Sequence, residues 1–224
     1  MVDSQTILKD YLSEARLSIA IHLHERTKGA YQYPDLQIDI ARSCVDLSWD
    51  YLKRKLPEEE AFMLPLNIWV DFANLLFSDK PMYNCARKKI PKKVVEAIRS
   101  DIFEVRGHYR GEWIDAKFEE GTITYPKFDS SGKLTQVTEP LEGCLMEDRL
   151  PGINLESWLK NPTSQGFPKN KIKKGDLYYG CPRVGTVALF GAYSVWAGLG
   201  CFRYPQYSGS DLGVRRAKIF EGRK

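Results

Sequence analysis

Residues 184–202 contain no formally charged side chain, and this window limits the possible folds more than any other part of the chain. Its sequence is VGTVALFGAYSVWAGLGCF, between Arg183 and Arg203, in a protein of which 28% of the residues are charged. A run of this length and composition must be buried, either in a protein core or in a lipid bilayer.

Two structures fit the window. A membrane helix needs about 20 apolar residues, and flanking arginines can reach the bilayer surface. Glycines interrupt the run, however, and divide it into two strand-like pieces, residues 186–190 and 193–197. We therefore expect two buried strands and no membrane partner.

The chain start and the cysteines indicate the compartment. The first residues, MVDSQTILKDYLSEAR, contain acidic side chains where a secretory signal has a basic stretch and an apolar core. The five cysteines are odd in number and widely spaced, so they predict neither a disulfide framework nor a metal site. We expect a cytoplasmic protein with reduced thiols.

Apolar residues recur every three or four positions through the first half of the chain, which is typical of helices. The pattern predicts four of them: over residues 6–24, from after Asp35 to before Pro57, over residues 58–77 and from Pro91 to near Gly107. Pro65 is expected to kink or divide the third.

After Gly107 the period changes from three or four to two, which is typical of strands. Residues 113–118, 122–128 and 133–138 alternate and are separated by turn sequences, predicting a three-stranded antiparallel meander. The predicted class is α+β, with a helical region at 1–107 and a β-rich, mainly antiparallel region at 108–224. The two regions form either separate domains or one continuous domain.

The C-terminal segment is basic and rich in aromatic and glycine residues. From Pro168 onward, eleven Lys or Arg face three Asp or Glu, although the net charge of the whole chain is only +4. Clustered cations bind phosphates, and aromatic rings stack on unpaired bases. The candidate nucleic-acid contacts are Lys169, Lys171, Lys173, Lys174, Arg183, Arg203, Tyr204, Tyr207, Arg215, Arg216 and Lys218.

Gly198-Leu199-Gly200, together with residues 212–216, resembles the C-terminal glycine-rich loop of CRISPR repeat-associated RNA-binding proteins. This resemblance covers fewer than 20 residues and implies RNA binding through a loop. The first half of the chain departs from that family, which usually opens with a strand of a ferredoxin-like fold.

Two further patterns are similar to nuclease motifs. His22-Leu23-His24 with Tyr51 resembles the metal-binding pair and nucleophile of rolling-circle replication nucleases, but the helical periodicity around the pair predicts that its two rings point apart. Asp101, Asp115 and Lys117 fit the D…(D/E)xK pattern of nucleases in which carboxylates hold Mg²⁺ and a lysine orients water. Magnesium is an expected cofactor only under this second alternative.

Three functions remain open on the sequence. The first is binding of RNA or single-stranded DNA by the basic aromatic segment. The second is a non-catalytic subunit whose apolar window packs against a protein partner. The third is a Mg²⁺-dependent nuclease that uses Asp101, Asp115 and Lys117.

Overall fold

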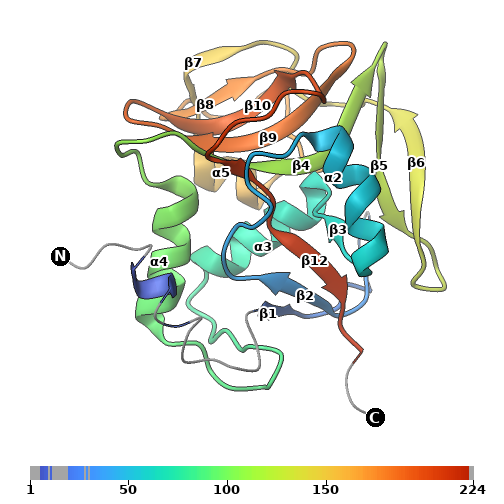
Figure 1. Ribbon diagram of the computed structural model, residues 1–224. Coiled ribbons are helices and arrows are strands. Elements are labelled where there is room, and N and C mark those ends of the chain that lie inside the picture. Colours follow the sequence, from blue (N-terminus) through green and yellow to red (C-terminus); the bar gives the residue numbers. More distant parts are fainter. Residues whose placement is uncertain (1–5, 10, 12–19, 28, 30, 222–224) are drawn as a thin grey trace.

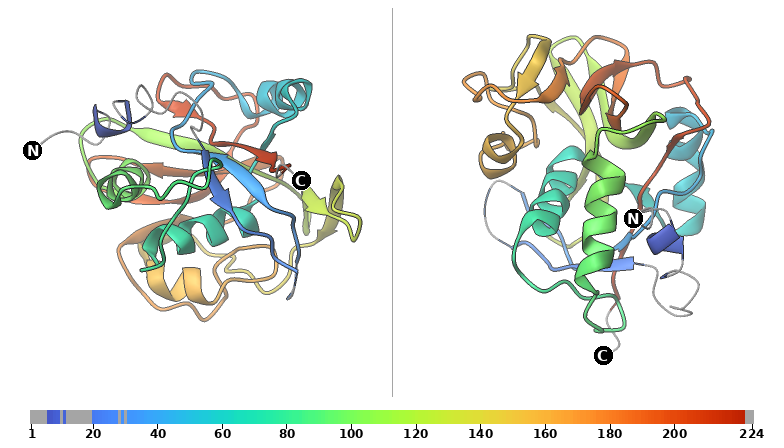
Figure 2. Two further views of the ribbon diagram at one scale, coloured as in Figure 1. Left: turned by 90° about the horizontal axis from the view of Figure 1, so that it is seen from below. Right: turned by 90° about the vertical axis from the view of Figure 1, so that its left-hand side faces the viewer.

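The structure is a computed structural model that describes residues 6–9, 11, 20–27, 29 and 31–221. Two β-sheets form most of it (Figures 1 and 2). The smaller sheet has four antiparallel strands in the order β1 (Ala20–Leu23), β2 (Leu36–Asp39), β12 (Arg216–Ile219) and β3 (Phe62–Met63). The last strand of the chain therefore lies between two strands from its first third.

The larger sheet has eight strands and mixed directions. Its order is β6 (Leu134–Pro140), β5 (Thr122–Phe128), β4 (Arg110–Glu119), β9 (Thr186–Ala192), β10 (Ala197–Arg203), β8 (Leu177–Gly180) and β7 (Arg149–Ile153). The eighth strand, β11 (Leu212–Gly213), pairs with β4. The β10–β8 and β11–β4 pairs are parallel, and the others are antiparallel.

The helices are few and short. Besides the helical residues 6–9 and 11, they are α2 (Trp49–Lys55), the 3-10 turn η1 (Leu56–Glu59), α3 (Leu66–Phe77), α4 (Lys92–Phe103) and α5 (Leu155–Lys160). Figure 1 shows α3 between the two sheets, with α4 beside it. Eight of the twelve α3 residues are buried, as expected for a helix that is covered on several sides.

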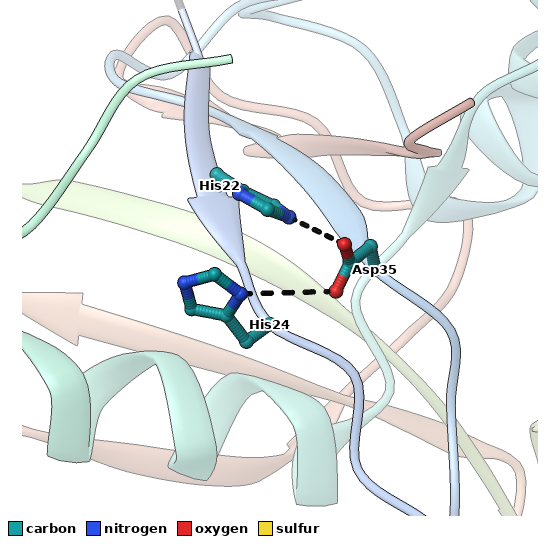
Figure 3. A group of neighbouring side chains, drawn as sticks. All are labelled: His22, His24 and Asp35. Atoms are coloured by element: carbon teal, nitrogen blue, oxygen red, sulfur yellow. Dashed lines mark ion pairs between the residues drawn. The ribbon is translucent and has the colours of Figure 1, made fainter. Parts of the chain in front are cut away.

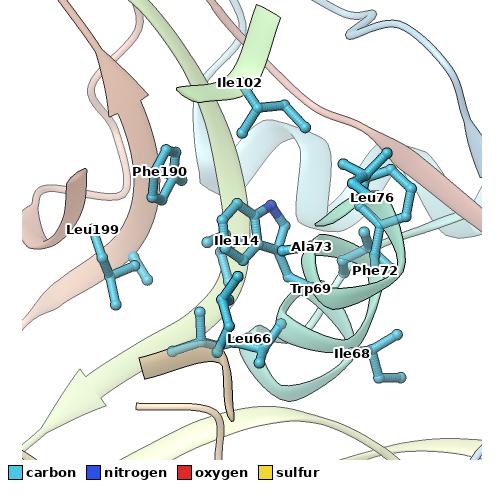
Figure 4. Packing of buried hydrophobic residues seen from close by; sticks show 14 of the residues in the cluster. Leu66, Ile68, Trp69, Phe72, Ala73, Leu76, Ile102, Ile114, Phe190 and Leu199 are labelled. Carbon is cyan, nitrogen blue, oxygen red and sulfur yellow. The ribbon is translucent and has the colours of Figure 1, made fainter. Parts of the chain in front are cut away.

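Trp69 of α3 joins the helix to the larger sheet (Figure 4). Its ring lies 4.8 Å from that of Phe190 on β9 and 5.9 Å from that of Trp158 on α5, and its Nε1 donates a hydrogen bond to Glu112. The same core cluster contains Ile21 and Ile38 of the smaller sheet. One hydrophobic core thus includes residues from both sides of position 107.

The predicted fold class is wrong, because the N-terminal half is not mainly helical. Residues 20–23 and 36–39 form β1 and β2, where helices were expected. Ile21, Leu23, Leu36 and Ile38 are buried at a spacing of two, a pattern that overlaps with the helical spacing of the longer window. Of the predicted first helix, residues 6–9 and 11 are helical, and residues 12–19 lie outside the described part of the chain.

Helices α3 and α4 occupy the predicted third and fourth helical segments. The structure begins α3 after Pro65, which stands in an extended conformation as its N-cap. Residues 58–63, expected to form the start of the same helix, instead belong to η1 and β3. Proline is tolerated at a helix start and disrupts a helix interior, which accounts for the division.

The predicted meander is confirmed as β4, β5 and β6. The uncharged window is a strand pair, β9 and β10, as expected, but its second strand starts at Ala197 and residues 193–196 connect the two. Gly198 and Gly200 are inside β10, so they form no glycine-rich loop of the kind that the CRISPR-associated resemblance implies. Among the residues described, we find no helix with the length and apolar content needed to cross a membrane.

Candidate nucleic-acid interface

Strands β8 and β10 present different residues to the two sides of the larger sheet. Leu177, Tyr179, Leu199 and Cys201 are buried in the main core. Because side chains alternate along a strand, Gly180, Gly198 and Gly200 belong to the opposite, outer side. Glycines therefore stand at outer positions of β8 and β10, where they leave room for neighbouring side chains to pack directly against the strand backbone.

Aromatic rings occupy the space above these glycines. A Cβ atom built on Gly180 would be 2.2 Å from the ring of Phe202, and one built on Gly191 would be 3.1 Å from the ring of Tyr109. A side chain at position 180 would displace Phe202 from the sheet. Glycine allows the ring to lie against the strands.

Four half-buried or exposed rings and two arginines gather on this outer side, and we call the group the aromatic–arginine face. Its members are Tyr178, Trp196, Phe202, Tyr207, Arg183 and Arg203. The ring of Tyr178 lies 5.2 Å from that of Trp196 and 6.2 Å from that of Phe202. These separations are typical of interacting aromatic pairs.

Both arginines of the face lie over aromatic rings. The guanidinium carbon of Arg203 is 5.5 Å from the Phe202 ring centroid and 5.1 Å from that of Tyr207. Arg183 is 5.4 Å from the Phe202 ring centroid and also forms an ion pair with Asp148 at 2.6 Å. The Arg183 side chain is 56% exposed, so its charge remains accessible to solvent.

Tyr178 and Tyr109 are uncharged near neutral pH. Burial raises the pKa of Tyr178 above its ordinary value. Burial also raises the pKa of Tyr109 to about 12, although Arg203 acts to lower it. Neutral rings beside two guanidinium groups can stack on bases without repelling phosphates.

Helix α2 covers the neighbouring half of the outer side, over β4 and β9. A second hydrophobic cluster over β4 and β9 contains Trp49 and Leu52 of α2 and Trp113 and Leu189 of the sheet. Leu189 is directly paired with Gly200, so the covered and uncovered halves meet at this strand pair. The aromatic–arginine face therefore lies on the same side of the sheet as this second cluster, next to the part that α2 covers.

The four candidate lysines Lys169, Lys171, Lys173 and Lys174 lie in one loop beside β7. Lys174 forms an isolated bridge with Ile153, the last residue of β7, and the backbone N–H of Asn154 donates to the carbonyl of Lys173. Since Ile153 pairs with Leu177, this lysine loop lies beside the start of β8, whereas Arg183 and Arg203 lie towards the opposite ends of the parallel strands β8 and β10.

The remaining basic candidates lie in the smaller sheet or next to it. Arg215 is only 2% exposed and forms ion pairs with Glu112 at 3.0 Å and with Asp101 at 3.6 Å. Arg216 forms ion pairs with Asp39 and Glu59, and Lys218 donates to the Glu59 carbonyl. The structure thus brings Arg183, Arg203, Tyr207 and the adjacent, 70% exposed Tyr204 to one region, and it places Arg215, Arg216 and Lys218 elsewhere.

The three nuclease candidates have different surroundings. Asp101 is buried beside Arg42 and Arg215, whereas Asp115 is buried beside Lys53 at 2.6 Å. Lys117 forms an ion pair with Glu119 at 3.0 Å. The two carboxylates line different cavities.

Asp115 has a strongly altered acidity. Burial raises its pKa to about 6, although the Lys53 ammonium acts to lower it. Its backbone N–H donates to Leu64, at an irregularity where β4 loses register with β9. Asp115, Lys53 and Gln136 line a cavity of about 800 Å³ that the sequence did not reveal, because α2, β4 and β6 each supply one of them.

Comparison with known protein families, curated proteins and solved structures finds no match to this chain. Function must therefore be argued from the residues themselves. Phe202 is not among the residues predicted from the sequence, although the alternation of glycine with apolar residues in β10 was the available signal that a ring covers that strand.

Proposed function

We propose that this protein binds single-stranded nucleic acid, RNA or DNA, through the aromatic–arginine face. The observation that carries the proposal is the position of Arg203 over the rings of Phe202 and Tyr207 on the uncovered half of the sheet. Unpaired bases stack on such rings, and guanidinium groups pair with the phosphates between them.

Charge supports the same surface. Arg203 forms no ion pair with a carboxylate of the described residues, so its charge is available to a ligand. The lysine loop lies beside the start of β8 and offers further cations to a nucleic-acid strand long enough to reach along β8 from Arg203. Duplex binding is a poorer fit, because the bases of a duplex are stacked on each other and closed to the rings.

The test is fluorescence anisotropy of labelled oligo-U and oligo-dT, titrated with the protein at several salt concentrations. Binding that weakens with salt is expected, because each neutralised phosphate of a single strand contributes about 0.7 to the slope of log affinity against log salt. Arg203→Lys keeps the charge and removes the planar group, so it should weaken binding while leaving this slope nearly unchanged. Lys92→Ala, an exposed charge loss on α4, is the control. An affinity that is indifferent to salt, or to Arg203, refutes the proposal.

A protein partner on the same region is the second candidate. Val184 and Val195, at the two ends of the β9–β10 pair, are 65% and 76% exposed. Exposed apolar residues next to aromatic rings suit a protein interface. Self-association that Val195→Asp abolishes, together with no oligonucleotide binding, would favour this second function.

A further inference from the structure

His22 and His24 lie on the same side of the smaller sheet, close to Asp35 (Figure 3). Ile21 and Leu23 of β1 are buried. Because side chains alternate along an extended chain, His22 and His24 lie on the opposite side of the sheet. Leu23 pairs with Leu36, and the antiparallel register carries Asp35 to a position opposite His24. The expected helix would have separated the two rings, and the strand brings their centroids to 4.3 Å.

The three side chains converge on a small volume. Asp35 Oδ2 is 2.8 Å from His22 Nε2, and Asp35 Oδ1 is 3.9 Å from His24 Nδ1. One ligand atom from each residue lies within 4.8 Å of the others. Tetrahedral zinc with ligands at about 2.0 to 2.1 Å needs ligand atoms about 3.3 Å apart, so small rotations of the exposed His24 ring complete the geometry.

The second observation is the environment of His22. Its side chain is 9% exposed, and its ring lies 4.7 Å from that of Phe220. The buried Nε2 atom has no hydrogen bond of proper geometry with the described residues, although Asp35 is so near. A buried nitrogen that faces a carboxylate without a directed hydrogen bond is suited to share a cation with it.

Asp35 is held in place from a second direction. The backbone N–H of Glu25 donates to its Oδ1 at 2.7 Å. A carboxylate that is held in a fixed orientation is a ready metal ligand.

We propose that His22, His24 and Asp35 bind one divalent transition-metal ion of the zinc type. Imidazole nitrogens with a carboxylate suit zinc and its neighbours, whereas Mg²⁺ and Ca²⁺ prefer oxygen ligands alone. Three protein ligands leave the fourth position to water, and His24, 75% exposed, leaves the site open to solvent. The proposal is independent of nucleic-acid binding, because its residues lie in β1 and its connection to β2, in the other sheet.

The test is calorimetric titration of the full chain with Zn²⁺ after treatment with a chelator and its removal. One ion per chain is expected. Loss of one ligand should exceed the 10- to 100-fold cost typical of second-sphere changes, so His24→Ala and Asp35→Asn should each weaken binding by at least about 100-fold. His24 is exposed, so His24→Ala should fold normally, which circular dichroism checks.

The chain offers a matched control, because His108 is its third and last histidine. His108→Ala should bind Zn²⁺ like the unmodified chain. Co²⁺ separates the proposed ligands from the five cysteines, since thiolates give a charge-transfer band that nitrogen and oxygen ligands lack. Equal binding by His24→Ala and His108→Ala, a thiolate band, or no binding tighter than about micromolar would each overturn the site.

Discussion

Strands β10 and β12 both carry arginines from the basic C-terminal segment, yet the two strands use them differently. Arg203, which ends β10, lies over two rings on the uncovered half of a sheet. Arg215 and Arg216, at the start of β12, lie among Glu112, Asp101, Asp39 and Glu59. A count of positive charges therefore does not define a binding surface, because the acidic partners of β12 come from distant parts of the sequence.

The largest expected difference between the two strands is in stability. Arg215→Met keeps most of the side-chain volume but removes a cation from between two buried carboxylates, which should cost about 3 to 5 kcal/mol of unfolding free energy. Arg203→Ala loses only the contacts of a half-buried side chain with two rings, worth about 1 kcal/mol. Urea unfolding measures both. Equal losses of unfolding free energy would contradict the difference proposed between the buried Arg215 and Arg203.

The second prediction concerns Asp115, a buried acid whose raised pKa makes the free energy of unfolding depend on pH. Its pKa rises to about 6 in the folded protein, from about 4 in an unfolded chain, because burial disfavours the charge. The folded state therefore holds the proton more tightly, and stability should fall by about 3 kcal/mol in total as pH rises from well below 4 to well above 6.

The check is urea unfolding of the unmodified chain and of Asp115→Asn across this pH range. The variant has no carboxyl to titrate at position 115, so the difference between the two chains should change through pH 4 to 6. Parallel stability curves would show that Asp115 is not the perturbed group.

The third prediction concerns the rings of the aromatic–arginine face. Phe202→Leu should weaken oligonucleotide binding by about 1 to 3 kcal/mol, the usual worth of one base stacked on an aromatic ring. Phe62→Leu makes the same change on β3, where Phe62 meets Phe128 at 5.9 Å, and it should leave affinity unchanged. Anisotropy titrations of both variants decide whether the position of the ring matters.

The smallest effect should appear in salt dependence. Neutralising Lys169, Lys171, Lys173 and Lys174 to glutamine should lower the slope of log affinity against log salt by about 0.7 for each lysine that contacts a phosphate. An unchanged slope would remove the lysine loop from the interface while leaving the aromatic–arginine face untested by this variant.

The sequence predicted the parts of the fold whose signals are local. Pro91 and the apolar spacing of residues 94–102 predicted α4, and alternation with turn sequences predicted β4 to β6. It failed at β1 and β2, which are four residues long, because a strand so short shares its apolar positions with a helical pattern. One of them, β2, pairs with β12, more than 170 residues away, and no local pattern shows that pairing.

The site followed the same rule. Arg183 and Arg203 were chosen as candidates because they flank the uncharged window, and Tyr207 was chosen because it is an aromatic residue among the basic ones. Phe202 was not chosen, because it stands inside the window expected to be buried. The partners of Arg215 could not be predicted, since Asp101 and Glu112 are brought to it by α4 and β4. The sequence pattern singled out His22 and His24, but the helix predicted around them would have pointed their rings apart, whereas β1 brings them together.

The central claim is that position, and not charge alone, makes β10 the binding strand. The most direct measurement compares two double variants that each remove two positive charges from the C-terminal segment, Arg183→Ala with Arg203→Ala and Arg216→Ala with Lys218→Ala, in their affinity for labelled oligo-U. The account predicts that the first pair weakens binding by at least about tenfold, since a hydrogen bond to a charged group contributes about 1.5 to 3 kcal/mol, and that the second pair leaves binding unchanged. Equal weakening by both pairs, or none by the first, would contradict it.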